Sequence, residues 1–126
     1  MHSVAYVERA RDWAITLEDR ERHRSGTKLP DARAAVAERI GVPAGTLKNL
    51  RLNRVKGIAV HWYEAIRAAV VRDLQLELQR LHHEQHVLLQ TGAHPASDEV
   101  AEVASDIQAV RLALGLPAVP DRGDDA

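Results

Sequence analysis

The sequence has no cysteine and no phenylalanine, and its aromatic side chains are two Trp and two Tyr. Without cysteine, disulfides and thiolate metal sites are excluded, and no feature points to an oxidising compartment. The scarcity of aromatic and β-branched runs argues against a β-sandwich. No apolar run approaches the roughly 20 residues that span a bilayer. We therefore expect a small helical protein of the cytoplasm.

The sequence also lacks the residue patterns of common catalytic and metal sites. There is no Gly-rich phosphate loop, and no nucleophile with a matching base can be identified from the spacing. His82 and His86 lie one helical turn apart, but a zinc-protease pattern starting at His83 would require histidine at position 87, where Val87 stands. These histidines are interpreted as surface residues, and we expect no enzyme activity, metal or cofactor.

What the sequence does contain is apolar residues at helical spacing, which predict an all-α fold. The predicted helices cover residues 3–24, 27–40, 44–53, 59–90 and 97–114. In the first helix the apolar stripe ends at Leu17, so its charged remainder is expected to be a solvent-exposed extension. Thr27 is the expected cap of the second helix, and Ser97 that of the fifth.

These helices predict three parts of the chain. Residues 1–58 form an N-terminal helix-turn-helix domain, and residues 59–116 form a long helix followed by an antiparallel helix. Residues 117–126, rich in Pro, Gly and Asp, are expected to be a disordered tail. The long apolar seams of the two C-terminal helices are typical of a coiled-coil-like interface, either within the chain or between copies.

Charge is distributed unevenly along the chain, although the formal net charge is −1. Residues 20–56 contain ten Lys or Arg and three acidic residues, a net charge of +7, whereas residues 93–126 have a net charge of −5. A basic concentration of this kind is typical of a protein that binds a polyanion. The alternative is a solvated helical surface with an excess of arginine.

Residues 33–52 have the pattern that a helix-turn-helix requires for steric reasons. Small and apolar residues occupy the inward positions of both helices, and a glycine that tolerates positive φ stands at the turn. These motif positions are Val36, Ala37, Ile40, Gly41, Val42, Leu47 and Leu50.

This segment resembles the helix-turn-helix of lambda-repressor-like proteins and related phage and mobile-element regulators. The resemblance is carried by Val36-Ala37-Glu38-Arg39-Ile40-Gly41-Val42 and Gly45-Thr46-Leu47-Lys48-Asn49-Leu50-Arg51. It covers about a fifth of the chain. Pro43 and Ala44 stand where that family often has Ser or Thr as the cap of the recognition helix. The resemblance implies binding to double-stranded DNA, with residues 44–53 in the major groove.

The geometry of such a complex assigns roles to the polar residues. Candidates for base contacts are Thr46, Lys48, Asn49 and Asn53, because Lys can donate to guanine O6 and N7 and Asn can pair with adenine N6 and N7. Candidates for phosphate contacts are Lys28, Arg33, Arg39, Arg51, Arg54 and Lys56.

The function predicted from the sequence is a sequence-specific transcription regulator, acting as a homodimer through residues 59–90 and 97–114. A homodimer places two recognition helices in successive major grooves about 34 Å apart. Two alternatives stay open. One is an architectural, packaging or excision protein of a phage or mobile element, and the other is a helical adaptor that binds another protein and no DNA.

Overall fold

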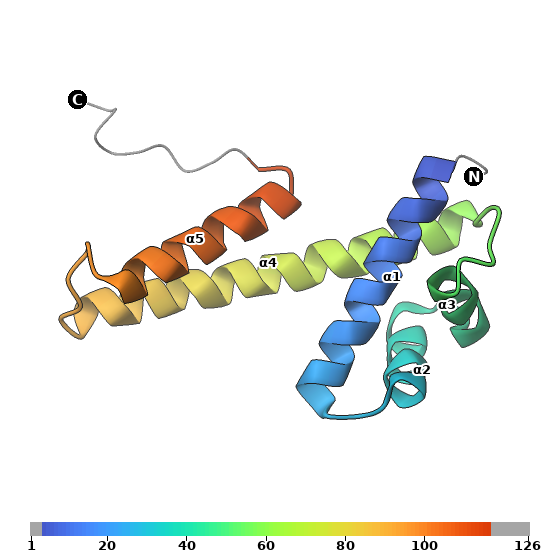
Figure 1. The fold of residues 1–126 in the computed structure, drawn as a ribbon, viewed down its shortest axis with the longest axis horizontal. Coiled ribbons are helices and arrows are strands. Elements are labelled where there is room, and N and C mark those ends of the chain that lie inside the picture. The colour runs from blue at the N-terminus through green and yellow to red at the C-terminus, as the bar shows by residue number, and fades with distance from the viewer. Residues whose placement is uncertain (1–3, 117–126) are drawn as a thin grey trace. The chain divides into compact units, whose positions relative to one another are not determined.

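The computed structural model describes residues 4–116, which fold entirely into helices joined by short loops. The helices in this range are α1 (Val4–Ser25), α2 (Leu29–Ile40), α3 (Ala44–Arg51), α4 (Val60–Gln90) and α5 (Asp98–Ala113) (Figure 1). The all-α prediction is confirmed, and the predicted tail of residues 117–126 lies outside the described range. No helix among residues 4–116 combines the length and the apolar character needed to cross a membrane.

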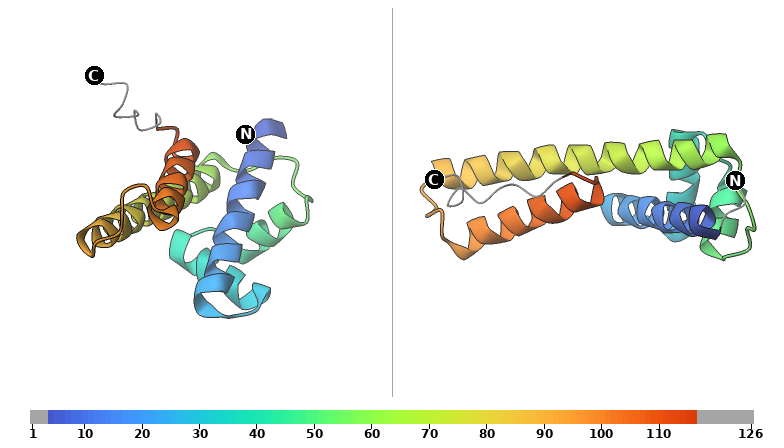
Figure 2. Two further views of the ribbon diagram at one scale, coloured as in Figure 1. Left: turned by 60° about the vertical axis from the view of Figure 1, so that its left-hand side comes forward. Right: turned by 90° about the horizontal axis from the view of Figure 1, so that it is seen from above.

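The helices belong to two compact units that divide between Val70 and Val71. The division falls inside α4, which continues through it without a break (Figure 2). The sequence placed a boundary between residues 58 and 59. The early part of α4 belongs to the first unit because Tyr63 and Ile66 are buried there, at 4% and 0% exposure.

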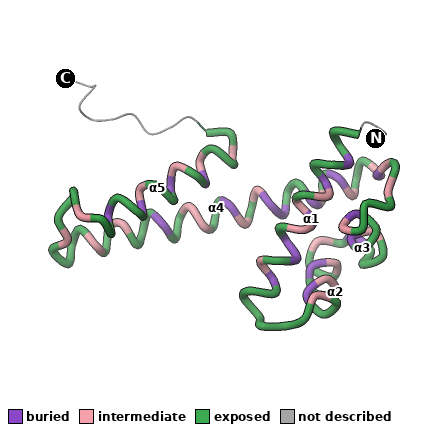
Figure 3. The backbone as a smooth tube through the Cα atoms, viewed as in Figure 1, coloured by how far each residue is buried: buried purple, intermediate pink, exposed green. Residues whose placement is uncertain are grey.

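In the first unit, α1 packs against both α2 and α3, and α2 packs against α3. Each helix contributes buried apolar residues at helical spacing. These are Val7, Ala10, Ala14 and Leu17 of α1, Ala32 and Val36 of α2, and Leu47 and Leu50 of α3. Figure 3 marks the buried positions along the backbone in purple. Because α2 and α3 share one partner helix, α1 sets the position of both.

An aromatic cluster joins α1 to the beginning of α4. The ring of Tyr63 lies 5.3 Å from that of Tyr6, edge to face, and 5.5 Å from that of Trp13. Arg9 Nη1 donates to the Tyr63 hydroxyl at 3.4 Å, which gives this buried phenol a polar partner. Trp13 and Trp62 are half-buried.

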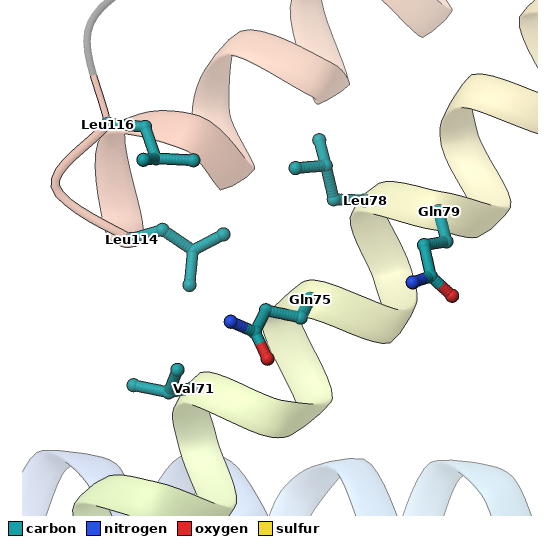
Figure 4. A pocket seen from close by; sticks show the side chains of 6 residues that line it. All are labelled: Val71, Gln75, Leu78, Gln79, Leu114 and Leu116. Carbon is teal, nitrogen blue, oxygen red and sulfur yellow. The ribbon is translucent and has the colours of Figure 1, made fainter.

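The second unit contains the rest of α4 and α5. Ser97 caps α5 as predicted, because its Oγ accepts from the Val100 amide at 3.3 Å. The buried side chains of this unit are Leu74 and Leu81 of α4 and Val100, Val103, Ile107 and Val110 of α5. A hollow of about 430 Å³ is lined by Val71, Gln75, Leu78, Gln79, Leu114 and Leu116 (Figure 4).

Two local predictions are wrong. The charged end of α1 is exposed on one face only, because Glu18 and Glu21 are buried, at 0% and 8% exposure, whereas Asp19, Arg22 and His23 are exposed. Thr27 does not cap α2, whose N-cap residue is Lys28 with no side-chain capping bond. The Thr27 hydroxyl lies 2.7 Å from Ser25 Oγ instead, so it is engaged at the end of α1.

Candidate nucleic-acid interface

The corner between α2 and α3 is formed around Gly41. This residue follows the last residue of α2 and has φ 74° and ψ 26°, the left-handed conformation of a helix C-cap. Its amide donates to the Ala37 carbonyl at 3.0 Å. The amides of Thr46 and Leu47 both donate to the Pro43 carbonyl, at 3.0 and 3.2 Å, so α3 begins almost at once.

Replacing Gly41 by alanine is expected to lower the free energy of unfolding by about 1 kcal/mol, because a Cβ strains a residue with positive φ. A Cβ at Gly41 meets no atom within 4 Å, so the backbone angle alone causes the cost. Gly45→Ala is the matched control, since Gly45 lies within α3 and is also open to a Cβ. It should raise stability, by up to about 1 kcal/mol. Urea denaturation measures both; equal effects of the two variants would contradict the role given to Gly41.

Helix α3 has one buried face and one exposed face. Leu47 and Leu50 are 0% and 1% exposed and hold the helix against the core. Lys48 and Asn49 are exposed, and Thr46 is half-buried at the edge between the two faces. Both predicted groove-reading side chains are therefore accessible to a ligand.

The predicted motif residues are buried to different degrees. Val36, Val42, Leu47 and Leu50 are all at most 2% exposed. Ala37 and Ile40 are half-buried, and Gly41 is exposed at the corner. Ala32, which was not among the predicted motif positions, is fully buried in the first turn of α2.

A cluster of charged residues holds α1, α2 and α3 together, and we call it the Glu18 cluster (Glu18, Asp19, Arg33 and Arg51). The Glu18 carboxylate accepts from Arg33 Nε through Oε2, at 2.5 Å, and from Arg51 Nε through Oε1, at 3.0 Å. Arg51 Nη2 also donates to Asp19 Oδ1 at 2.6 Å. A carboxylate with no exposed surface thus receives a charged donor from each of the two other helices.

The Glu18 cluster favours the charged form of the Arg51 guanidinium. Burial by itself lowers the pKa of Arg51, but its hydrogen bonds and its attraction to Glu18 and Asp19 outweigh that effect and raise the pKa above its usual value. A raised pKa contributes stability that is lost only when the pH rises through the folded-state value. This contribution is therefore complete at neutral pH.

Two of the predicted phosphate-contact residues belong to the Glu18 cluster. The side chains of Arg33 and Arg51 are only 12% and 23% exposed, and each binds Glu18. Their phosphate contacts stay predictions, but both arginines already have a structural role inside the protein. The other candidates, Lys28, Arg39, Arg54 and Lys56, are exposed. Among these, Arg39 has an interaction with another part of the protein.

Asn53 lies beyond α3, which ends at Arg51 and not at residue 53 as predicted. Its φ is 58°, a left-handed conformation that asparagine tolerates better than most residues, and its amide donates to the Leu50 carbonyl at 3.0 Å. The residue therefore ends the helix. Its contact with a base stays a prediction.

Glu18 was not predicted as a core residue, because a charged residue normally ends an apolar stripe. The signal that could have found it is the spacing, because Val7, Ala10, Ala14 and Leu17 are followed in phase by Glu18 and Glu21. An acidic residue that continues a buried stripe requires cationic partners. The sequence contains many arginines, and it does not indicate which of them pair with Glu18.

No group of three or more His, Cys, Asp or Glu side chains within residues 4–116 is arranged to hold a metal ion. Comparison of the chain with family models, with curated proteins and with solved structures finds no match. The case for a function therefore depends on the geometry and the charge of the first unit.

Proposed function

We propose that this protein binds double-stranded DNA in a sequence-specific manner as a homodimeric transcription regulator. In this proposal α2, the Gly41 corner and α3 form a helix-turn-helix, and α3 is the recognition helix in the major groove. Lys48 and Asn49 contact base edges, while the exposed cations around them contact phosphates.

One observation carries the proposal. Leu47 and Leu50 are buried while Lys48 and Asn49, on the same short helix, are exposed next to a glycine corner. Lysine and asparagine both carry the donors that base edges in the major groove accept. The net charge of +7 over residues 20–56 supports a polyanionic ligand over an uncharged one.

The homodimer is proposed for the second unit. Its α4 and α5 expose Leu76 and Leu112, at 55% and 67%, and carry the apolar hollow in addition. We place α5 antiparallel to α4, since Leu114 and Leu116, at the end of α5, line the same hollow as Val71. Two helices by themselves form a thin core, and pairing with a second copy would give four.

Selection of bound sequences from random duplex DNA tests both parts of this proposal. We expect a consensus with two-fold symmetry, whose half-sites are about 10 base pairs apart or a multiple of that. Affinity for the selected duplex should fall steeply with salt, with a slope of log K against log[salt] near −0.9 for each phosphate contacted.

Two other outcomes would change the proposal. A consensus without symmetry would retain DNA binding and remove the homodimer. Absence of duplex binding at low salt, with the helical circular dichroism spectrum intact, would contradict DNA binding and favour an adaptor that binds another protein.

A further inference from the structure

A second surface feature of the first unit lies beside the Glu18 cluster. It is a hollow of about 460 Å³ lined by Asp19, Arg22, His23, Gly26, Thr27 and Arg51, and we call it the α1–α3 hollow. Its lining comes from the end of α1, from the loop that leads to α2 and from the last turn of α3. The burial of Glu18 and Glu21 docks this end of α1 and thereby brings Arg22 and His23 to the hollow.

The lining of the hollow is positively charged. Its one carboxylate, Asp19, lies 2.6 Å from Arg51 Nη2, so its charge is balanced by that guanidinium. Arg22 is exposed and forms no ion pair with any residue between 4 and 116. His23 adds an imidazole that can donate a hydrogen bond to an anion. The Thr27 hydroxyl also lines the hollow, but it donates to Ser25 Oγ, whose own proton is given to the Glu21 carbonyl.

Two neighbouring features favour a phosphate as the anion. Thr27 directly precedes Lys28, the N-cap of α2, which has no side-chain capping bond, so the positive end of that helix dipole lies next to the hollow. Arg51 follows Lys48 by one helical turn on α3, which places both on the same flank of the helix. A duplex contacted by Lys48 would therefore bring its backbone toward this side.

We infer that the α1–α3 hollow is a phosphate-binding site, and that it holds one backbone phosphodiester of the DNA when α3 occupies the major groove. Arg22 supplies the free cation, and Arg51, whose charge is balanced by Glu18 and Asp19, forms the wall of the hollow beside it. The duplex part of this inference rests on the proposed function. The site adds Arg22 and His23 to the interface, residues that sequence spacing alone does not select.

Duplex binding measured over a range of salt concentrations tests the site. Arg22→Ala should reduce the magnitude of the slope of log K against log[salt] by about 0.9 and lower affinity roughly tenfold at 0.1 M salt, equally for all sequences. Arg22→Lys should restore most of the slope, because the charge returns. Arg72→Ala is the matched control, since Arg72 is an exposed arginine of the second unit, and its slope should stay that of the wild type.

A titration with inorganic phosphate alone separates this site from the wider proposal. The side-chain NMR signals of Arg22, His23 and Arg51 should shift on addition of phosphate in the wild type, and the remaining signals should not shift in Arg22→Ala. If these shifts occur but no duplex binds, the hollow is a site for a free phosphate group and the proposed function fails. If neither the signals nor the salt slope responds to Arg22→Ala, the inference is overturned, even where duplex binding itself persists.

Discussion

Replacing Glu18 by alanine is expected to lower the free energy of unfolding by about 3–5 kcal/mol, the range found when one partner of a buried ion pair is removed. Glu18 is fully buried and joins α1 to α2 through Arg33 and to α3 through Arg51. Without its carboxylate, two guanidiniums of 12% and 23% exposure are left close together with a cavity between them. Only Arg51 keeps an acidic partner within the cluster, Asp19.

This loss is a large fraction of the total free energy of unfolding of a folded domain, which is about 5–15 kcal/mol. Chemical denaturation followed by circular dichroism measures it. Glu8→Ala is the matched control, because Glu8 is an exposed glutamate of the same helix, and its effect should stay within about 0.5 kcal/mol. An equal effect for the two glutamates would contradict the importance given to the Glu18 cluster.

If Glu18→Ala does not fold, the isosteric variant Glu18→Gln allows the same measurement. The amide keeps the shape of the side chain but loses the charge and offers a single acceptor oxygen to two guanidiniums. A double-mutant cycle of Glu18→Gln with Arg33→Met then isolates the interaction across α1 and α2. We expect an interaction energy above about 1 kcal/mol, and a value near zero would mean that the two side chains stabilise the fold independently.

Local features of the fold could be predicted from the sequence, whereas the Glu18 cluster could not. Helix positions, the Gly41 corner and the Ser97 cap follow from local patterns, because each depends on residues within a few positions of one another. Glu18 depends on Arg33 and Arg51, which are 15 and 33 residues away in the sequence. Their meeting is a consequence of the way α1 packs on α2 and α3, which no local spacing encodes.

The candidate interface also has a part that the sequence predicts and a part that it does not. The exposure of Lys48 and Asn49 follows from the helical phase set by Leu47 and Leu50, so the sequence was sufficient to predict it. The inward engagement of Arg33 and Arg51 was not predictable, since an arginine on a partly buried helix face can bind a carboxylate or remain in solvent. Basic residues counted along the chain therefore overstate the number that are available to a ligand.

Combined replacement of Lys48 and Asn49 by alanine is expected to remove most of the sequence preference of DNA binding. A good bidentate pairing with a base contributes about 1–3 kcal/mol of discrimination, so two together contribute about 2–6 kcal/mol, or a factor of about 30 to 10⁴. Both side chains are exposed, so stability should change by less than about 1 kcal/mol. Competition between the selected duplex and a scrambled one measures the preference.

The matched control for this pair is Arg72→Ala combined with Gln90→Ala, which removes one cation and one amide from exposed positions of α4. This control should retain the full preference for the selected duplex. In the Lys48 and Asn49 variant, residual binding should persist with similar affinity for both duplexes, since the exposed cations outside α3 still contact phosphates. A preference that survives both replacements would contradict the base-reading roles given to Lys48 and Asn49.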